Sequence, residues 1–243
     1  MHLKACTKGV ERVKPKELWL GTRTEEGARA AADSVRRPTA DDVTAVVLAG
    51  GAATRMGGID KGLVDLNGRP FAAHVLERLR GQCADVVISA NRNLETYRGF
   101  GHPVVPDEVS GFQGPLAGIA AALDVVRTPL AVVAPCDSPY LPSDYVQRLL
   151  AAFADAGCRA AAAAAGGRPQ PVFMMIEAGL GDELKAWLAR GERKVRGWLE
   201  SVGVVWVPFP DVHAFDNLNT AEDLELAQGR RLGSCSGDVV QKD

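Results

Sequence analysis

With 243 residues, 47% of them hydrophobic and 24% charged, the chain is long enough for one sizeable α/β domain and has the composition of an ordinary globular protein. Its formal net charge of −2 excludes a general electrostatic attraction to nucleic acid or to an anionic membrane. No apolar run approaches the roughly 20 residues of a membrane span. Five widely spaced cysteines without a C-x-x-C pair favour reduced thiols in the cytoplasm over disulfides or a zinc site.

The two ends of the chain differ in composition from its middle. Residues 1–42 are rich in Lys, Arg, Glu, Thr and Ala but poor in large apolar side chains, so we expect an extension that is flexible or loosely docked. Residues 229–243 form a polar tail. The segment 43–228 is therefore expected to fold as the single domain.

Short apolar runs alternate with amphipathic segments along this domain. The apolar runs predict strands at 43–48, 85–89, 102–105, 130–134, 159–165, 172–176 and 204–207. The amphipathic segments predict helices at 70–80, 115–126, 142–156, 182–189 and 194–201. The alanine run within 159–165 is the least typical strand, because alanine favours helix. The alternation predicts a three-layer α/β/α domain with a Rossmann-like, mostly parallel sheet covered by helices on both faces.

The segment after the first expected strand is the most informative in the chain. Residues 48–62 read L-A-G-G-A-A-T-R-M-G-G-I-D-K-G. Glycines let backbone N–H groups approach phosphate oxygens closely, and ligands bind at the carboxyl ends of strands in such sheets. Arg55 and Lys61 can neutralise a triphosphate, Arg by forked contacts and Lys as a point charge. The segment matches neither G-x-x-x-x-G-K-[ST] nor G-x-G-x-x-G, and an ordinary glycine-rich turn is the alternative interpretation.

The order of L-A-G-G, R-M-G and D-K-G in this segment resembles the signature of the nucleotidyltransferases related to molybdenum cofactor guanylyltransferase. Further segments follow in that family's order: L-N-G-R-P at 66–70, I-S-A-N-R-N at 88–93, Asp107, G-P-L-A-G at 114–118, P-C-D-S-P at 135–139, G-E-R-K-V at 191–195 and D-N-L-N-T at 216–220. The resemblance covers residues 43–228 and implies a sheet of the nucleotidyltransferase type.

Asp137 directly follows the strand expected at 130–134, so its carboxylate should lie at the carboxyl edge of the sheet. Mg²⁺ is commonly bound by one or two carboxylates together with phosphate oxygens and water. The resemblance implies that Asp137 is the Mg²⁺ ligand; the alternative is a helix-capping or loop acid. A thiolate role for the neighbouring Cys136 finds no support in the spacing of histidines and acids.

The resemblance also implies a GTP site along this edge. Lys61 and Arg55 would bind the triphosphate, and backbone contacts would come from Leu48, Ala49, Gly50 and Gly51. Asp107 would hold the base or the ribose, unless it is simply a surface-loop acid. The comparable position of relatives carries Asn where this chain has the shorter Ser89, so the nucleotide contact could come from Ser89 or from Asn91.

Further residues are candidates for substrate contacts. Gly114 and Pro115 precede a helix whose first N–H groups could meet an anion, or they could serve packing alone. Asn217 and Asn219 face the same way in an extended chain. The resemblance implies that these two residues contact the pterin substrate, together with Arg168. The alternative is an Asx turn that caps the last helix.

The function implied by the resemblance is transfer of GMP from Mg-GTP to the phosphate of molybdopterin (Mo-molybdopterin), with release of pyrophosphate. That phosphate is already ionised near neutral pH, so no general base is needed. Alternatives are a molybdopterin cytidylyltransferase, a sugar-1-phosphate nucleotidyltransferase and a nucleotide-binding partner protein without activity. The pair Gly50-Gly51 favours guanine, since relatives that use cytosine show L-A-A-G there. Proteins that supply or receive the cofactor are expected as transient partners.

Overall fold

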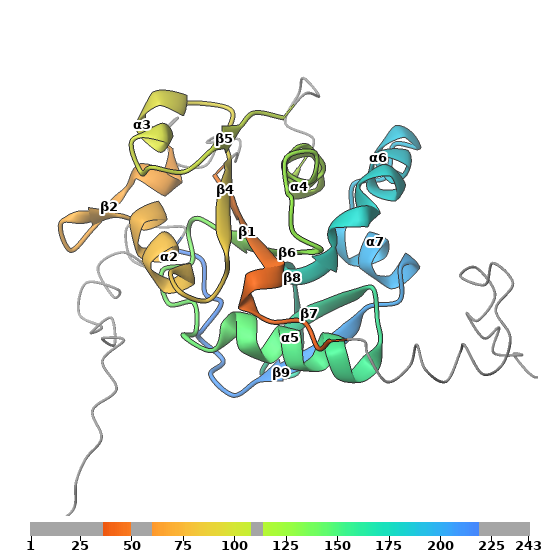
Figure 1. Cartoon of the computed structure of the whole chain (residues 1–243). Coiled ribbons are helices and arrows are strands. Elements are labelled where there is room, and N and C mark those ends of the chain that lie inside the picture. Colours follow the sequence, from red (N-terminus) through yellow and green to blue (C-terminus); the bar gives the residue numbers. More distant parts are fainter. Residues whose placement is uncertain (1–35, 50–59, 108–113, 219–243) are drawn as a thin grey trace, which may run out of the picture. The chain divides into compact units, whose positions relative to one another are not determined.

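The computed structural model describes residues 36–49, 60–107 and 114–218 (Figure 1). The chain divides into two units, Met1–Arg37 and Pro38–Asp243, and all that follows concerns the second. Of the expected N-terminal extension, only its last residues are described. They end in a 3-10 helix, η1 (Ala40–Asp42), and the Asp42 carboxylate accepts a hydrogen bond of 2.7 Å from Thr39 N. The expected tail at 229–243 lies outside the described residues.

Seven strands form one sheet in the order β5-β4-β1-β6-β8-β7-β9. Their bounds are β1 (Val43–Leu48), β4 (Asp85–Ser89), β5 (Val104–Val105), β6 (Leu130–Pro135), β7 (Ala160–Ala165), β8 (Arg168–Glu177) and β9 (Val205–Phe209). Neighbouring strands are parallel except around β8, which runs antiparallel to β6 and β7. A tight turn at Gly166 and Gly167, both with positive φ, joins β7 to β8. The prediction of a mostly parallel sheet is confirmed.

Helices cover both faces of this sheet (Figure 1). One face carries α2 (Phe71–Leu79) and α5 (Tyr145–Ala156). The other carries α4 (Pro115–Leu123), α6 (Gly181–Ala189) and α7 (Val195–Ser201). Strand β1 contributes side chains to both cores, which explains why five of its six residues are apolar instead of alternating with polar ones. The expected three-layer α/β/α architecture is confirmed.

The alanine run forms strand β7 despite the helix propensity of its residues. The strand lies between β8 and β9 and is buried along almost its whole length. Ala161 and Ala163 face the core under α5, whereas Ala160 and Ala162 face the core under α7. Pairing on both sides and burial on both faces therefore override the local preference, as is usual for β propensity.

Several predicted elements are shorter in the structure than in the sequence pattern, among them α4, which ends at Leu123 instead of at residue 126. Helix α5 begins at Tyr145, three residues after Pro142, because the Tyr145 N–H first closes a turn by donating to Pro142 O at 3.1 Å. Strand β5 comprises only Val104 and Val105. Pro103, which precedes it, has no N–H to contribute to the ladder.

Three short elements were not predicted. Strands β2 (Asp65–Leu66) and β3 (Arg69–Pro70) form a hairpin, and helix α3 (Leu94–Arg98) follows β4. The hairpin turn is Asn67-Gly68, with φ of 55° and 82°. The N-G dipeptide is a recognised signal for such a turn and could have revealed the hairpin.

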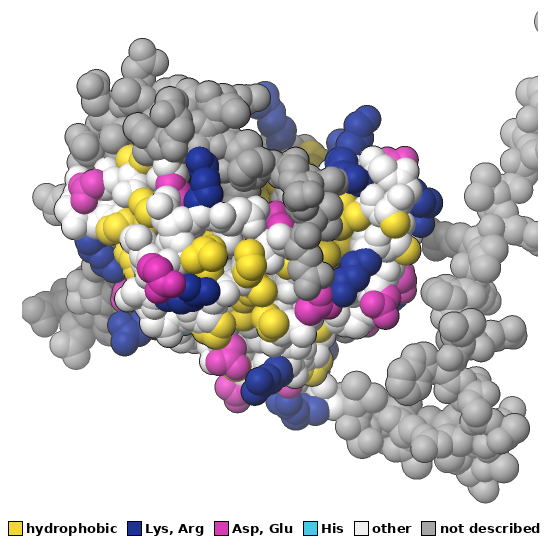
Figure 2. Space-filling view, turned by 90° about the horizontal axis from the view of Figure 1, so that it is seen from above, with side chains coloured by type: hydrophobic (Ala, Val, Ile, Leu, Met, Phe, Trp, Pro, Cys, Tyr) yellow, Lys and Arg dark blue, Asp and Glu magenta, His cyan; other side chains and the backbone are white. Residues whose placement is uncertain are grey.

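Figure 2 shows the surface of the protein from above, after a turn of 90° about the horizontal axis from the view of Figure 1. Lys and Arg side chains are interspersed with Asp and Glu side chains around a group of apolar ones, and on the described part of this face neither sign forms a continuous field. This distribution agrees with the formal charge of −2. Among the described helices, none has the length and apolar character required to cross a bilayer.

Candidate active site

Four neighbouring parallel strands, β5, β4, β1 and β6, end at the same edge of the sheet. Leu48, the last residue of β1, is in register with Ser89 of β4 and with Pro135 of β6. The pairing continues past the strand ends, because Ala49 N donates to Ser89 O at 2.7 Å and Cys136 N donates to Leu48 O at 3.0 Å. The segments that follow these strands therefore begin side by side, at the edge where ligands bind in open α/β sheets.

Lys61 and Asp137 meet at this edge. Lys61 Nζ lies 3.8 Å from Asp137 Oδ2, and the two side chains are 26% and 16% exposed. Burial raises the pKa of Asp137, and the neighbouring Lys61 ammonium partly opposes that shift. The structure thus brings the predicted triphosphate lysine and the predicted metal ligand together, in a partly buried position still open to a ligand.

Asp60, directly before Lys61, is held by three donors. Its carboxylate accepts hydrogen bonds from Tyr97 Oη at 2.6 Å, from Asn93 Nδ2 at 2.9 Å and from the backbone N–H of Gly62 at 3.2 Å. The last bond caps the 3-10 helix η3 (Lys61–Leu63). Sequence reasoning did not single out Asp60, Asn93 or Tyr97, although Asp60 belongs to the D-K-G motif and Asn93 ends I-S-A-N-R-N.

Gly62 sits where no side chain fits. A Cβ at this position would lie 2.9 Å from Cys136 Sγ and still closer to the Tyr97 hydroxyl. Cys136 itself is buried, and burial raises the pKa of its thiol well above the ordinary value. A buried neutral thiol is a poor nucleophile, so Cys136 acts here as a packing surface for the D-K-G segment.

Asp107 lies in a second polar cluster at the same edge. Asn91 forms a reciprocal pair with it: Asn91 Nδ2 donates to Asp107 Oδ2 at 2.9 Å, and Asp107 N donates to Asn91 Oδ1 at 2.7 Å. Ser89 Oγ donates to Asp107 Oδ1 at 3.4 Å. Gly118 of α4 closes the cluster, because a Cβ there would lie 2.5 Å from Ser89 Oγ. Ser89 and Asn91 therefore both orient Asp107; that either contacts a nucleotide stays a prediction.

The segment containing Asn217 is attached to the loop after β6. Ser138 Oγ donates to Asn217 Oδ1 at 2.6 Å, and Leu218 N donates to Asp137 O at 3.1 Å. Ser138 is buried, and it is a further residue that sequence reasoning missed. These bonds bring Asn217 to the same edge as Asp137.

The remaining predicted residues fall into two groups. Gly50, Gly51, Arg55 and Asn219 lie outside the described residues. Gly114 and Pro115 are exposed at the start of α4, where Gly114 has a φ of 82°. Arg168 is exposed as the first residue of β8, next to the hairpin turn.

Within 36–49, 60–107 and 114–218, no group of three or more His, Cys, Asp or Glu side chains is arranged to hold a metal ion. Mg²⁺ does not need such a group, since one or two carboxylates with substrate phosphates commonly bind it. The partly buried Asp137 carboxylate, at the edge where a phosphate ligand would bind, fits this mode.

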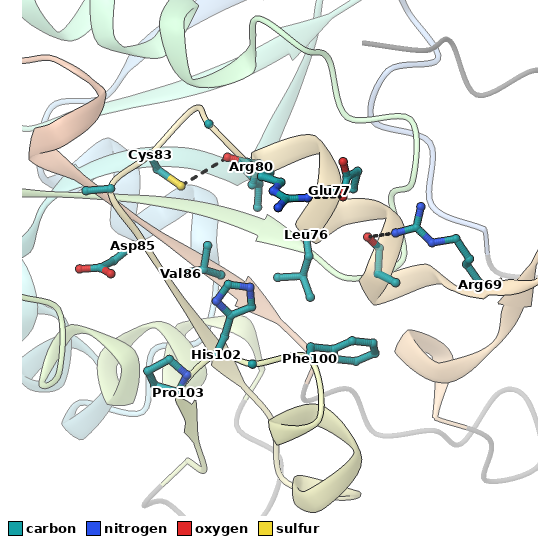
Figure 3. Close-up of a pocket in the computed structure, with 15 residues that line it drawn as sticks. Arg69, Leu76, Glu77, Arg80, Cys83, Asp85, Val86, Phe100, His102 and Pro103 are labelled. Carbon is teal, nitrogen blue, oxygen red and sulfur yellow. Dashed lines mark hydrogen bonds and ion pairs between the residues drawn. The ribbon is translucent and has the colours of Figure 1, made fainter. Parts of the chain in front are cut away.

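A hollow of about 620 Å³ lies elsewhere, near the amino end of β4 (Figure 3). Leu76 from α2, Val86 from β4 and the ring of His102 border it. Asp85, the first residue of β4, also lines it, whereas Ser89 at the site edge is the last residue of that strand. This hollow is therefore separate from the cluster around Lys61 and Asp137.

Comparison with known proteins identifies the family of the chain. Residues 45–204 match the family described as the MobA-like NTP transferase domain. A molybdenum cofactor guanylyltransferase of Ralstonia nicotianae is 47% identical over 203 residues, which cover 80% of this chain and 99% of the relative. Another, of Burkholderia vietnamiensis, is 50% identical over 191 residues, covering 75% and 93%.

Solved structures show the same fold. Molybdopterin-guanine dinucleotide biosynthesis protein A of Archaeoglobus fulgidus aligns with a TM-score of 0.63 at 27% identity, covering 76% of this chain and 96% of that protein. Sequence match, fold and the arrangement of the carboxyl edge all lead to one assignment: the chain belongs to the MobA-like NTP transferase family, among the molybdenum cofactor guanylyltransferases.

Proposed function

We propose that this protein transfers GMP from Mg-GTP to the phosphate of molybdopterin, forming the guanine dinucleotide cofactor and pyrophosphate. The observation that carries the proposal is the approach of Lys61 Nζ to Asp137 Oδ2, 3.8 Å apart at the carboxyl edge of the sheet. One side chain can offset phosphate charge and the other can hold a divalent cation. The high identity to named guanylyltransferases supports guanine as the base and molybdopterin as the acceptor.

The reaction is formation of a phosphoanhydride. An oxygen of the molybdopterin phosphate attacks the α-phosphorus of GTP, and the bond from that phosphorus to the oxygen bridging the β-phosphorus breaks. Pyrophosphate leaves with the electron pair. Because the attacking phosphate is already ionised near neutral pH, the protein's task is to position the reactants and to stabilise charge.

Lys61 is assigned to the charge that accumulates on the leaving pyrophosphate, with Arg55 as its partner. Its ammonium lies 3.8 Å from a partly buried carboxylate, and the lysine side chain is one-quarter exposed, so the charge is partly desolvated and still accessible to a phosphate. Charge interactions are stronger in such a place than in bulk water. Leu48 and Ala49, with Gly50 and Gly51, are assigned to backbone contacts with the nucleotide.

Asp137 is assigned to the Mg²⁺ ion. When bound there, the ion would polarise the α-phosphate and offset the charge of the pyrophosphate. The carboxylate must be ionised to hold it. Burial disfavours the ionised form, whereas the Lys61 ammonium favours it and so partly offsets the effect of burial.

Two further groups are assigned to recognition of the substrates. Asp107, oriented by Ser89 and Asn91, is assigned to the base or the ribose of GTP. Asn217 is assigned to the pterin, together with Asn219 and Arg168. The hydrogen bond from Ser138 to Asn217 supports this, because it ties that segment to the loop that carries Asp137. In the part of the chain that the structure describes, the thiols of Cys83, Cys136 and Cys158 are free, which supports a reducing, cytoplasmic location.

The test is incubation of the purified protein with molybdopterin, Mg²⁺ and each nucleoside triphosphate in turn. We expect pyrophosphate and a pterin guanine dinucleotide with GTP only, and no reaction when Mg²⁺ is chelated. A dinucleotide formed with CTP would reassign the enzyme as a cytidylyltransferase. Pyrophosphate release that depends on a sugar phosphate instead of molybdopterin would reassign the acceptor. No pyrophosphate with any nucleotide would leave only nucleotide binding.

A further inference from the structure

The contact between Lys61 and Asp137 is too long to fix the lysine by itself. At 3.8 Å the two atoms are beyond the 2.7–3.2 Å range of N–H···O hydrogen bonds. A lysine side chain also has high rotational freedom and acts as a point charge on a flexible stem. The position of the backbone that carries Lys61 therefore sets which points its ammonium can reach.

That backbone is held from the side of α3 through Asp60. Tyr97 lies in α3 and Asn93 is its N-cap residue, so both side-chain donors to the Asp60 carboxylate come from this short helix and its cap. Tyr97 is completely buried, and its only polar side-chain atom donates to Asp60 at 2.6 Å. The residue before Lys61 is thereby bonded to a fully buried side chain of α3.

The backbone is held a second time at Gly62, on the other side of Lys61. The α-carbon of Gly62 packs against the Tyr97 hydroxyl and against Cys136 Sγ so closely that a Cβ would collide with both. Cys136 is the residue before Asp137. The hydroxyl of Tyr97 thus contacts the D-K-G segment both at Asp60 and at Gly62, and Gly62 in turn rests on the segment that presents Asp137.

We propose that Asp60 and Tyr97 are positioning residues that hold the Lys61 ammonium opposite Asp137. This inference rests on the proposed transfer of GMP. Neither residue needs to contact a substrate: Tyr97 is fully buried, and both oxygens of Asp60 are occupied by the protein's own donors. Catalysis by positioned charge is sensitive to displacement, since a shift of about 1 Å can cost about 10²-fold in rate.

The first variant is Tyr97→Phe, which keeps the buried ring and removes only the hydroxyl. We expect kcat to fall at least about tenfold, with the KM for molybdopterin and the GTP dissociation constant within about threefold of wild type. A loss of kcat without loss of binding is what displacement of a charge-stabilising group produces. A merely structural role would instead lower the melting temperature and leave kcat per folded molecule unchanged.

Tyr145→Phe is the matched control. Tyr145 is also completely buried, and its hydroxyl donates a comparable hydrogen bond, 2.7 Å long, to Val133 O. It lies in α5 and contacts neither the D-K-G segment nor Asp107 in any interaction of the described residues. We expect this control to lower the melting temperature about as much as Tyr97→Phe while keeping the wild-type kcat.

A second pair of variants tests Asp60 by exchange of hydrogen-bonding groups. In Asp60→Asn, one side-chain oxygen becomes an NH₂ group, which faces either the NH₂ of Asn93 or the Tyr97 hydroxyl and the Gly62 N–H, so at least one donor loses its acceptor. The double variant Asp60→Asn/Asn93→Asp restores a donor–acceptor pair with the carboxylate moved to position 93. We expect the single variant to lose kcat at least about tenfold and the double variant to recover it to within about threefold of wild type.

The outcomes are distinct. If wild type releases no pyrophosphate from GTP, the proposed function fails and the positioning role falls with it. If wild type is active and Tyr97→Phe matches Tyr145→Phe in kcat, the positioning role is wrong and the proposed function stands. A double variant no faster than Asp60→Asn would likewise overturn the role of Asp60.

Discussion

Ser138 Oγ donates a hydrogen bond of 2.6 Å to Asn217 Oδ1, joining two residues 79 positions apart in the chain. The same two segments are joined at the backbone, since Leu218 N donates to Asp137 O at 3.1 Å. A small apolar cluster lies next to this junction and contains Leu66 and Phe71 from the region of the β2–β3 hairpin together with Leu218. The residue assigned to the pterin and the residue assigned to the metal are thus parts of one packed unit.

The first prediction concerns the hydroxyl of Ser138. Ser138→Ala removes one hydrogen bond, worth about 1 kcal/mol or about a factor of five. If Asn217 binds the pterin, the KM for molybdopterin should rise by about that factor while the KM for GTP stays constant. Steady-state kinetics with each substrate varied in turn measures this. Ser201→Ala is the control, because Ser201 Oγ donates to Trp198 O at 2.6 Å in α7 and no assigned residue is involved. Equal increases for both substrates would contradict a role of Asn217 specific to the pterin.

The second prediction concerns the charge of Asp137. Asp137→Asn keeps the shape of the side chain but removes the carboxylate that is assigned to Mg²⁺. We expect kcat/KM for GTP to fall by about 10² or more, because a charge contact made in the transition state is lost. Asp144→Asn is the surface control, since Asp144, the N-cap residue of α5, pairs with Arg148 of that helix and both side chains are 41% exposed. Near-normal turnover of Asp137→Asn at saturating Mg²⁺ would remove Asp137 from the metal site.

The sequence determined the order of the main elements but not the contacts at the site. The apolar run of β1 can be recognised as a strand in the sequence because both faces of the strand are buried. In β4 (Asp85–Ser89), the last three residues are buried in the same way. Helix α3, with five residues, is too short for periodicity to detect, and a hydrogen bond such as Tyr97 to Asp60 depends on where α3 lies in space. The motif showed that Asp60 and Lys61 belong together, but it could not show which buried group holds them.

The third prediction concerns the dependence of stability on pH. Burial raises the folded-state pKa of Asp137 above its ordinary value of 3.8, so the folded protein holds this proton more tightly than the unfolded chain does. Asp137 therefore stabilises the fold less as the pH rises from 3.8 through its raised folded-state pKa. Asp137→Asn does not lose stability in this way, because an amide does not titrate. With metal chelated, the melting temperature of Asp137→Asn minus that of wild type should therefore increase as the pH rises through this range.

Addition of Mg²⁺ supplies the control for this pH effect. A cation that binds the ionised carboxylate stabilises the folded state by mass action, and it does so only where Asp137 is present. With Mg²⁺ and GTP both present at neutral pH, wild type should gain more in melting temperature than Asp137→Asn. If the difference between the two proteins is the same at every pH and with or without the metal, the assigned shift of Asp137 is wrong.

The fourth prediction concerns the space beside Asp107. A Cβ at Gly118 would lie 2.5 Å from Ser89 Oγ and 3.2 Å from Asp107 Oδ1, so Gly118→Ala must displace one or both side chains. If Asp107 holds the base or ribose, the KM for GTP should rise about tenfold, and the KM for molybdopterin should not change. Gly179→Ala is the matched control, because a Cβ there would meet nothing within 4 Å. Kinetics of both variants at varied GTP concentration gives the comparison.

A compensating change makes this prediction specific. The closest atom to the added methyl group is the hydroxyl of Ser89, so Gly118→Ala/Ser89→Ala removes the principal collision. Asp107 would still be held by its two reciprocal hydrogen bonds with Asn91, of 2.9 Å and 2.7 Å. The double variant should therefore recover most of the GTP affinity that Gly118→Ala loses, because two changes that share one contact are not additive. If Ser89 itself contacts the nucleotide, the double variant will instead bind GTP more weakly than Gly118→Ala does. That result would show that Ser89 recognises GTP directly and does not act by orienting Asp107.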